Sequence, residues 1–120
     1  MKVIVVEQDL AMRTLVIKWL QDEGHDVRAL GVADIAGGID WQAELIVVDL
    51  VDLRGRASDR IREAHRRFPN AAIVGLSTEL SRSLGPLSPV TRSLGVHHLL
   101  AKPLGRDELL QALAEVATAR

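Results

Sequence analysis

The stretch "ELIVVDLVDL", residues 44–53, carries four consecutive aliphatic residues, 45–48, directly in front of the carboxylate of Asp49. A short run rich in β-branched residues is typical of a strand that is buried on both faces of a parallel sheet. A carboxylate at the end of such a strand is costly to bury unless other groups compensate its charge. The stretch therefore predicts a buried strand with a functional or capping acid at its carboxyl end.

Further apolar runs of similar length lie at residues 2–6, 26–30, 72–76 and 97–101. Between the runs, apolar residues return with the i, i+3, i+4, i+7 spacing of an amphipathic helix. Strands that alternate with helices predict an α/β fold: a doubly wound, five-stranded parallel sheet flanked by helices, as in flavodoxin-like proteins. The helical spacing is seen in Met12, Leu15, Val16 and Trp19; in Ile61, Ala64, His65 and Phe68; and in Leu109, Leu110, Leu113 and Val116.

Residues that begin and end helices flank these periodic segments. Asp9 is suited to cap the first helix and Gly24 to close it. A short helix is predicted between Ser88, as its cap, and Gly95, with a proline in its first turn. The segment 33–41 is the weakest helix candidate because two glycines lie inside it.

The composition is that of an ordinary globular domain. The 15 basic and 16 acidic side chains nearly cancel, so no overall charge favours a nucleic acid or an anionic membrane as partner. Cysteine is absent, which excludes disulfides and favours a reducing cytoplasm. The N-terminal apolar run is too short for a signal peptide or a membrane span. We expect one cytoplasmic domain over residues 1–120, without an output domain because the sequence ends soon after its last predicted helix. A single-domain protein and a domain of a longer protein are both consistent with this expectation.

Polar side chains of complementary chemistry follow the predicted strands. Open parallel sheets bind and react at the carboxyl ends of their strands. A carboxylate, a hydroxyl and an ammonium group gathered with further acids suit phosphoryl transfer onto an aspartate. Mg²⁺ is the expected ion because this edge offers hard oxygen ligands. The side chains concerned are Glu7, Gln8, Asp9, Asp49, Ser77, Thr78 and Lys102.

At these positions the sequence resembles a response-regulator receiver domain of two-component signalling, over essentially all 120 residues. The resemblance implies that Asp49 in "LIVVDLVDL" is the phosphoacceptor and that Ser77 in "VGLST" is the switch hydroxyl. It further implies that Lys102 in "LLAKPL" is the lysine of the family's site, followed by a cis peptide bond to Pro103. Each motif alone is weak, but together, in this order and at these spacings, they are specific.

The resemblance also implies a metal site formed by Glu7, Gln8, Asp49 and the backbone carbonyl of Val51. Gln8 stands where the family usually has an acid that ligates the metal directly, so one negative charge is missing. At an effective dielectric of ~20, a unit charge ~4 Å from another contributes ~4 kcal/mol before desolvation, and more against a divalent ion. We therefore expect Mg²⁺ to bind weakly.

Other departures concern the switch and its surface. Leu99 lies where the family often has a Tyr or Phe that swings inward when Ser77 moves. Leu53 replaces a common proline and Ala57 a usual glycine, which suggests a different path for this loop. The segment 78–95 is longer than the family norm and carries two prolines that cannot lie inside a helix. A remodelled partner surface and a tolerated loop insertion are both consistent with this segment.

Simpler interpretations exist for several of these residues. Asp49 taken alone fits a strand-end carboxylate that caps the next turn, and Lys102 fits a surface lysine before a bend. The arginines around the third predicted helix indicate a solvated face, because acids are interspersed and no aromatic platform accompanies them. The four histidines lack metal-ligand spacing. The arginines are Arg54, Arg56, Arg60, Arg62, Arg66 and Arg67.

The predicted function is that of a two-component receiver. A histidine kinase or phosphotransfer protein donates a phosphoryl group to Asp49, and a surface of the fourth helix, fifth strand and fifth helix then switches its binding of an output protein or a second copy. Such a domain regulates and does not turn over a substrate.

Two alternatives remain open. A pseudo-receiver, a phosphorylation-independent interaction or dimerisation module, is motivated by Gln8 and Leu99. A phosphatase-type enzyme ranks last because its two motif aspartates are separated by one residue, whereas Asp49 and Asp52 are separated by two.

Overall fold

Five parallel strands form a single sheet in a computed structural model that describes residues 1–31 and 41–119. The strand order is β2-β1-β3-β4-β5. This confirms the predicted doubly wound parallel sheet. The weak helix candidate over 33–41 lies outside the described residues except for Trp41, which is not helical. The strands are β1 (Lys2–Val6), β2 (Asp26–Ala29), β3 (Leu45–Asp49), β4 (Ala72–Ser77) and β5 (His98–Ala101).

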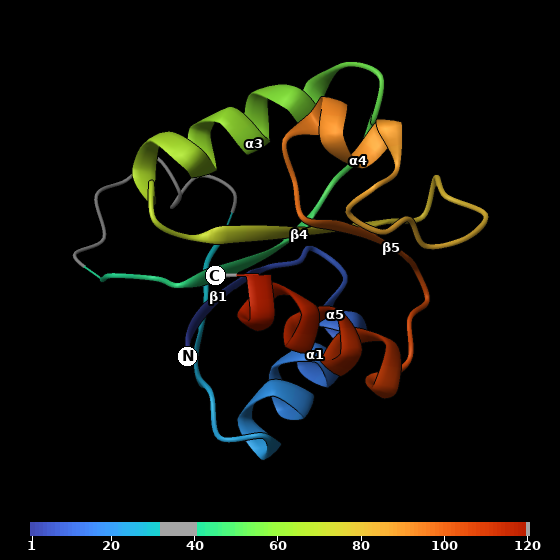
Figure 1. The fold of residues 1–120 in the computed structure, drawn as a ribbon. Helices are drawn as coiled ribbons and strands as arrows, with labels where there is room; N and C mark the ends of the chain where they lie inside the picture. Colours follow the sequence, from blue (N-terminus) through green and yellow to red (C-terminus); the bar gives the residue numbers. More distant parts are fainter. Residues whose placement is uncertain (32–40, 120) are drawn as a thin grey trace.

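Helices cover both faces of this sheet. α1 (Leu10–Asp22) and α5 (Arg106–Ala119) lie on one face, and α3 (Arg56–Arg67) and α4 (Pro89–Leu94) lie on the other (Figure 1). None of the helices in the described part of the chain is long and apolar enough to cross a membrane.

The central strands supply both hydrophobic cores because successive side chains point to opposite faces. In β1, Val3 and Val5 join the core beneath α1 and α5, whereas Ile4 and Val6 join the core beneath α3. All five residues of β3 and all six of β4 are buried, as predicted for strands covered on both faces. The prediction is wrong for β2, which is mostly exposed. Among the described strands this one lies at the edge of the sheet, with a neighbour, β1, on one side only.

α1 begins and ends as the sequence predicts, but it faces the core with a different stripe. The Asp9 carboxylate accepts hydrogen bonds from two backbone N–H groups of the first turn, and Gly24 follows the helix with a φ of 88°. The buried residues are Met12, Val16 and Leu20, spaced four apart. Leu15, predicted to face the core, is 44% exposed because it is rotated about 100° from Val16 on the helix.

The remaining helices follow the prediction more closely. Ile61, Ala64 and Phe68 are buried on the α3 side of the sheet. α4 is a single short helix, with Pro89 in its first turn and Gly95 at its end with a φ of 77°.

Candidate functional site

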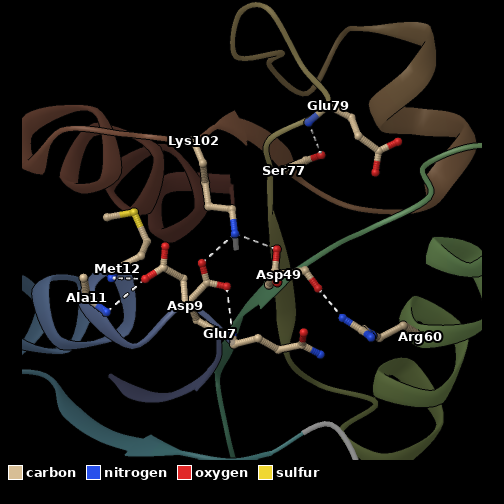
Figure 2. Close-up of polar contacts among 10 residues, drawn as sticks. Glu7, Asp9, Ala11, Met12, Asp49, Arg60, Ser77, Glu79 and Lys102 are labelled. Atoms are coloured by element: carbon tan, nitrogen blue, oxygen red, sulfur yellow. Dashed lines mark hydrogen bonds and ion pairs between the residues drawn. The ribbon is translucent and has the colours of Figure 1, made fainter.

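The carboxyl ends of β1, β3 and β5 bring two acids and one base into direct contact. The Lys102 Nζ atom lies 2.6 Å from Glu7 Oε1 and 2.8 Å from Asp49 Oδ1 (Figure 2). The Glu7 and Asp49 side chains are 0% and 8% exposed, and that of Lys102 is 10% exposed. The ammonium group therefore bridges two buried carboxylates. Lys102 is thus not a surface lysine, as the simpler interpretation had it.

The Asp49 carboxylate does not serve as the turn cap considered for it. That role falls to Asp52, whose Oδ2 accepts a hydrogen bond of 3.3 Å from the backbone N–H of Arg56 at the start of α3. The Asp49 carboxylate instead faces Lys102, at a strand end where both groups are shielded from water.

The protonation of this cluster follows from burial and from the charges within it. Burial raises the pKa of Glu7, the hydrogen bond from Lys102 partly opposes this shift, and repulsion from Asp49 adds to it. Burial disfavours the Lys102 ammonium, but the hydrogen bonds to Asp49 and Glu7 outweigh it and raise the pKa of Lys102. The lysine is therefore a fixed positive charge beside Asp49 at neutral pH.

Ser77 ends the neighbouring strand β4, but its hydroxyl is engaged elsewhere. Its residue is fully buried, and its Oγ accepts a hydrogen bond of 3.0 Å from the backbone N–H of Glu79 (Figure 2). The strand register pairs Asp49 with Leu76 and Ser77 with Ala101, so Ser77 lies in the row that adjoins the acid cluster. The structure thus brings Glu7, Asp49 and Lys102 into contact and leaves Ser77 beside them, turned toward its own loop.

The donors predicted for Mg²⁺ surround the same edge. Two buried carboxylates, Glu7 and Asp49, converge on one point, and hard carboxylate oxygens are the ligands that Mg²⁺ prefers. Gln8 lies just after β1 and Val51 lies in the loop after β3, and both are exposed. The amide oxygen of Gln8 and the backbone carbonyl of Val51 can add two neutral ligands at this edge. Within residues 1–31 and 41–119, no three acidic, histidine or cysteine side chains form a metal-binding group. The donor chemistry suits Mg²⁺, with one charged ligand fewer than the resemblance leads one to expect.

Comparison of the sequence with family models gives no match, and no curated protein matches it either. The structure does match solved proteins. The chemotaxis protein CheY4 of Vibrio cholerae is 22% identical, with a TM-score of 0.73 over 96% of this chain and 97% of that one. A response regulator from Thermotoga maritima is 20% identical, with a TM-score of 0.77 over 98% and 97%. The chain has the receiver-domain fold.

A third receiver structure is relevant to the chemistry of the site. The response regulator protein from Burkholderia pseudomallei is 19% identical, with a TM-score of 0.69 over 98% of this chain and 71% of that one. It was solved with a phosphorylated aspartic acid, a calcium ion and citrate. These statements concern that protein; for the present chain the match shows the fold.

One feature agrees with the motif around Lys102 and one departs from the family pattern. The peptide bond between Lys102 and Pro103 is cis, as the resemblance implies. Leu99, which stands where the resemblance leads one to expect a Tyr or Phe, is fully buried and packs in the core beneath α3.

Two residues of this receiver-fold site were not predicted from the sequence. Arg60 of α3 was assigned to a solvated face, but it is partly buried and its Nη1 donates a hydrogen bond to the backbone carbonyl of Asp49 (Figure 2). Glu79 accepts hydrogen bonds from the backbone N–H groups of Asp52 and Leu53, at 2.5 and 3.2 Å. The position of Glu79 two residues after Ser77 is the only sequence signal for its role, and it is a weak one.

Proposed function

We propose that this chain is a two-component receiver that accepts a phosphoryl group on Asp49 from a histidine kinase or phosphotransfer protein. The observation that carries the proposal is the Lys102 ammonium held between Asp49 and Glu7 at the reactive edge of a receiver fold. A nucleophilic carboxylate with a fixed cation beside it is what phosphoryl transfer to an aspartate requires.

The transfer step places each group in a defined role. An oxygen of Asp49 attacks phosphorus, the P–O bond forms as the P–N bond of the donor phosphohistidine breaks, and the imidazole leaves with the electron pair of that bond. Lys102 offsets the negative charge of the incoming phosphoryl oxygens because its ammonium already contacts Asp49 Oδ1. Ser77 becomes a donor to the phosphoryl group once its hydroxyl turns away from the Glu79 N–H.

Mg²⁺ belongs to this proposal as a weakly bound ion held by Glu7, Gln8, Asp49 and the carbonyl of Val51. When bound, it supplies positive charge that neutralises the phosphoryl oxygens. The protein's own part is to keep two carboxylates buried at one point, and Lys102 does so by placing its ammonium group between them.

The consequence of phosphorylation is regulatory. We place the partner-binding surface on α4, β5 and α5, because β5 pairs with β4, which ends at Ser77, and because Lys102 directly follows β5. An output protein or a second copy of the chain would bind there in the cytoplasm, with no membrane or nucleic acid involved directly.

Incubation with acetyl phosphate and Mg²⁺, followed by intact-mass measurement, tests the proposal. We expect one phosphoryl group per chain, labile to hydroxylamine as an acyl phosphate is, and no gain for Asp49→Ala. Asp52→Ala is the matched control, since this acid lies in the same loop and should leave the modification in place. A missing acyl phosphate, or modification that persists in Asp49→Ala, would reject the proposal.

Gln8 favours a second candidate, a pseudo-receiver that binds partners without being phosphorylated. With Gln8 neutral, the carboxylates of Glu7 and Asp49 and the ammonium of Lys102 leave one net negative charge to attract a divalent ion. Gln8→Asp should strengthen Mg²⁺ binding by at least about tenfold, since one further charge ~4 Å away contributes ~4 kcal/mol before desolvation. Gain of phosphorylation only in Gln8→Asp would favour the pseudo-receiver, whereas equal phosphorylation of both forms would favour the receiver.

A further inference from the structure

Residues 79–88, which we call the strap, connect the acceptor loop with the far edge of the sheet. At its first residue, the Glu79 carboxylate accepts hydrogen bonds from the backbone N–H groups of Asp52 and Leu53. Asp52 has a φ of 58°, a left-handed conformation that non-glycine residues seldom adopt. Successive N–H groups beside such a residue form a concave anion-binding element, and here the anion is the chain's own carboxylate.

The middle of the strap pairs with β5, the last strand of the sheet. The N–H of Leu84 donates to the carbonyl of Leu99 at 2.7 Å, and the N–H of Leu99 donates to the carbonyl of Leu84 at 2.9 Å. The Ser83 hydroxyl accepts a hydrogen bond of 2.9 Å from the N–H of Ala101 and itself donates to Glu108. Three outward-facing backbone groups of the edge strand are therefore satisfied by the strap. An edge strand without such cover offers its backbone to other chains.

Glu79 also connects the strap to the predicted switch. Its backbone N–H donates to Ser77 Oγ at 3.0 Å, so the serine hydroxyl and the strap hold each other in place (Figure 2). A phosphoryl group on Asp49 would bring about −1.5 to −2 charge to the loop whose N–H groups already hold the Glu79 carboxylate. It would also draw the Ser77 hydroxyl away from the Glu79 N–H. The hydrogen bonds of the Glu79 carboxylate and of the Glu79 N–H would therefore weaken together.

We propose that the strap is an autoinhibitory clasp: Glu79 latches it across the unphosphorylated protein, and release of Glu79 uncovers the edge of β5. The latch stands on the contacts above, whereas its trigger rests on the proposed phosphorylation of Asp49. In this chain the clasp would connect the Asp49 site with the edge of β5. An aromatic switch residue cannot make this connection here, because its position is taken by the buried Leu99.

Amide hydrogen exchange in the unphosphorylated protein tests the latch by itself. In Glu79→Gln the carboxylate's charge is lost while its size is kept, and we expect the amides of Leu99 and Ala101 to exchange roughly tenfold faster or more. Amides in the interior of β3 should be unchanged. Glu63→Gln, which changes a half-buried acid on α3 that pairs with Arg66, is the matched control and should have no effect. Leu84→Pro, which cannot donate to Leu99, shows the exchange of an open edge. Unchanged Leu99 and Ala101 exchange in Glu79→Gln would overturn the latch.

Exchange after addition of acetyl phosphate and Mg²⁺ tests the trigger. If Asp49 is phosphorylated and the two amides accelerate toward the Leu84→Pro values, the trigger is supported. If Asp49 is phosphorylated and the amides do not change, the trigger is overturned. Failure of phosphorylation in the mass measurement would overturn the proposed function and the trigger, and the Glu79→Gln result would still decide the latch.

Discussion

Replacing Lys102 with methionine removes the charge that two buried carboxylates share. Since one nitrogen contacts both Glu7 Oε1 and Asp49 Oδ1, these oxygens lie no more than about 5.4 Å apart. Two like charges ~5 Å apart repel each other by about 3 kcal/mol at an effective dielectric of ~20. Removal of one partner from a buried ion pair commonly costs about 3–5 kcal/mol. We expect Lys102→Met to lower the free energy of unfolding by about 3 kcal/mol at about pH 7.5, measured by urea denaturation.

The pH dependence of this loss has a definite sign. The pKa of Glu7 is already raised above its ordinary value of 4.5, and loss of the ammonium raises it further. An acid whose pKa is raised in the folded state destabilises the fold at pH values above that raised pKa. At pH values well below its pKa in the unfolded chain, the acid is protonated in both states and has no such effect. The free energy of unfolding therefore falls as pH rises from the unfolded-state pKa through the folded-state pKa. The difference between Lys102→Met and the wild type should therefore shrink as pH falls from about 7.5 toward about 5.

Two further variants test whether the loss in Lys102→Met comes from repulsion between the two carboxylates. Glu7→Gln combined with Lys102→Met leaves Asp49 without a like-charged neighbour and should recover most of the loss. Lys18→Met removes the exposed pair with Asp22, at 3.1 Å, and should cost no more than about 0.5 kcal/mol. A loss below about 1 kcal/mol in Lys102→Met, or an undiminished loss in the double variant, would mean that the carboxylates do not depend on the shared ammonium.

Three further changes follow from the structure. Glu7→Gln should stabilise the fold at neutral pH, because burial and repulsion from Asp49 disfavour the ionised acid, and the gain should vanish below about pH 4.5 in denaturation at several pH values. Asp9→Ala should cost about 1 kcal/mol in urea denaturation, since the side chain accepts from two N–H groups at the start of α1. Gly75→Ala should lower the melting temperature at a cost of about 1–3 kcal/mol, because an added Cβ would lie 2.5 Å from Leu50 Cδ1 and 2.9 Å from Leu99 Cδ2.

The elements of the central sheet could be predicted from the sequence because their signals are local. The runs that became β1, β3 and β4 are nearly uninterrupted aliphatic residues, and a strand covered on both faces requires this pattern. The exposure of β2 could not be predicted in the same way, since it depends on which strand takes the edge of the sheet. The exposure of Leu15 likewise depends on how α1 is rotated about its axis when it packs on the sheet. Apolar residues lie on two adjacent stripes of this helix, so their spacing alone does not determine which stripe faces the core.

The positions of the acid cluster were predictable for a topological reason. Residues that end parallel strands meet at one edge whatever lies between them, so Glu7, Asp49 and Lys102 could be expected near one another although 95 residues separate the first from the last. The orientation of the Ser77 hydroxyl was outside this reasoning. It depends on the backbone of the loop that follows β4, where the N–H of Glu79 donates to Ser77 Oγ.

The layered α/β architecture, the strand ends and the residue types available there follow from the order of the amino acids alone, because they depend on periodicity and on positions along single strands. The contact of Arg60 with the Asp49 carbonyl, that of Glu79 with the loop at Asp52, and the cover of Leu84 over the edge of β5 depend on how the folded elements meet. Each of these contacts joins a loop or helix face to a distant backbone group. Backbone groups are alike in every residue, so a sequence pattern carries no mark of which side chain or loop will satisfy them.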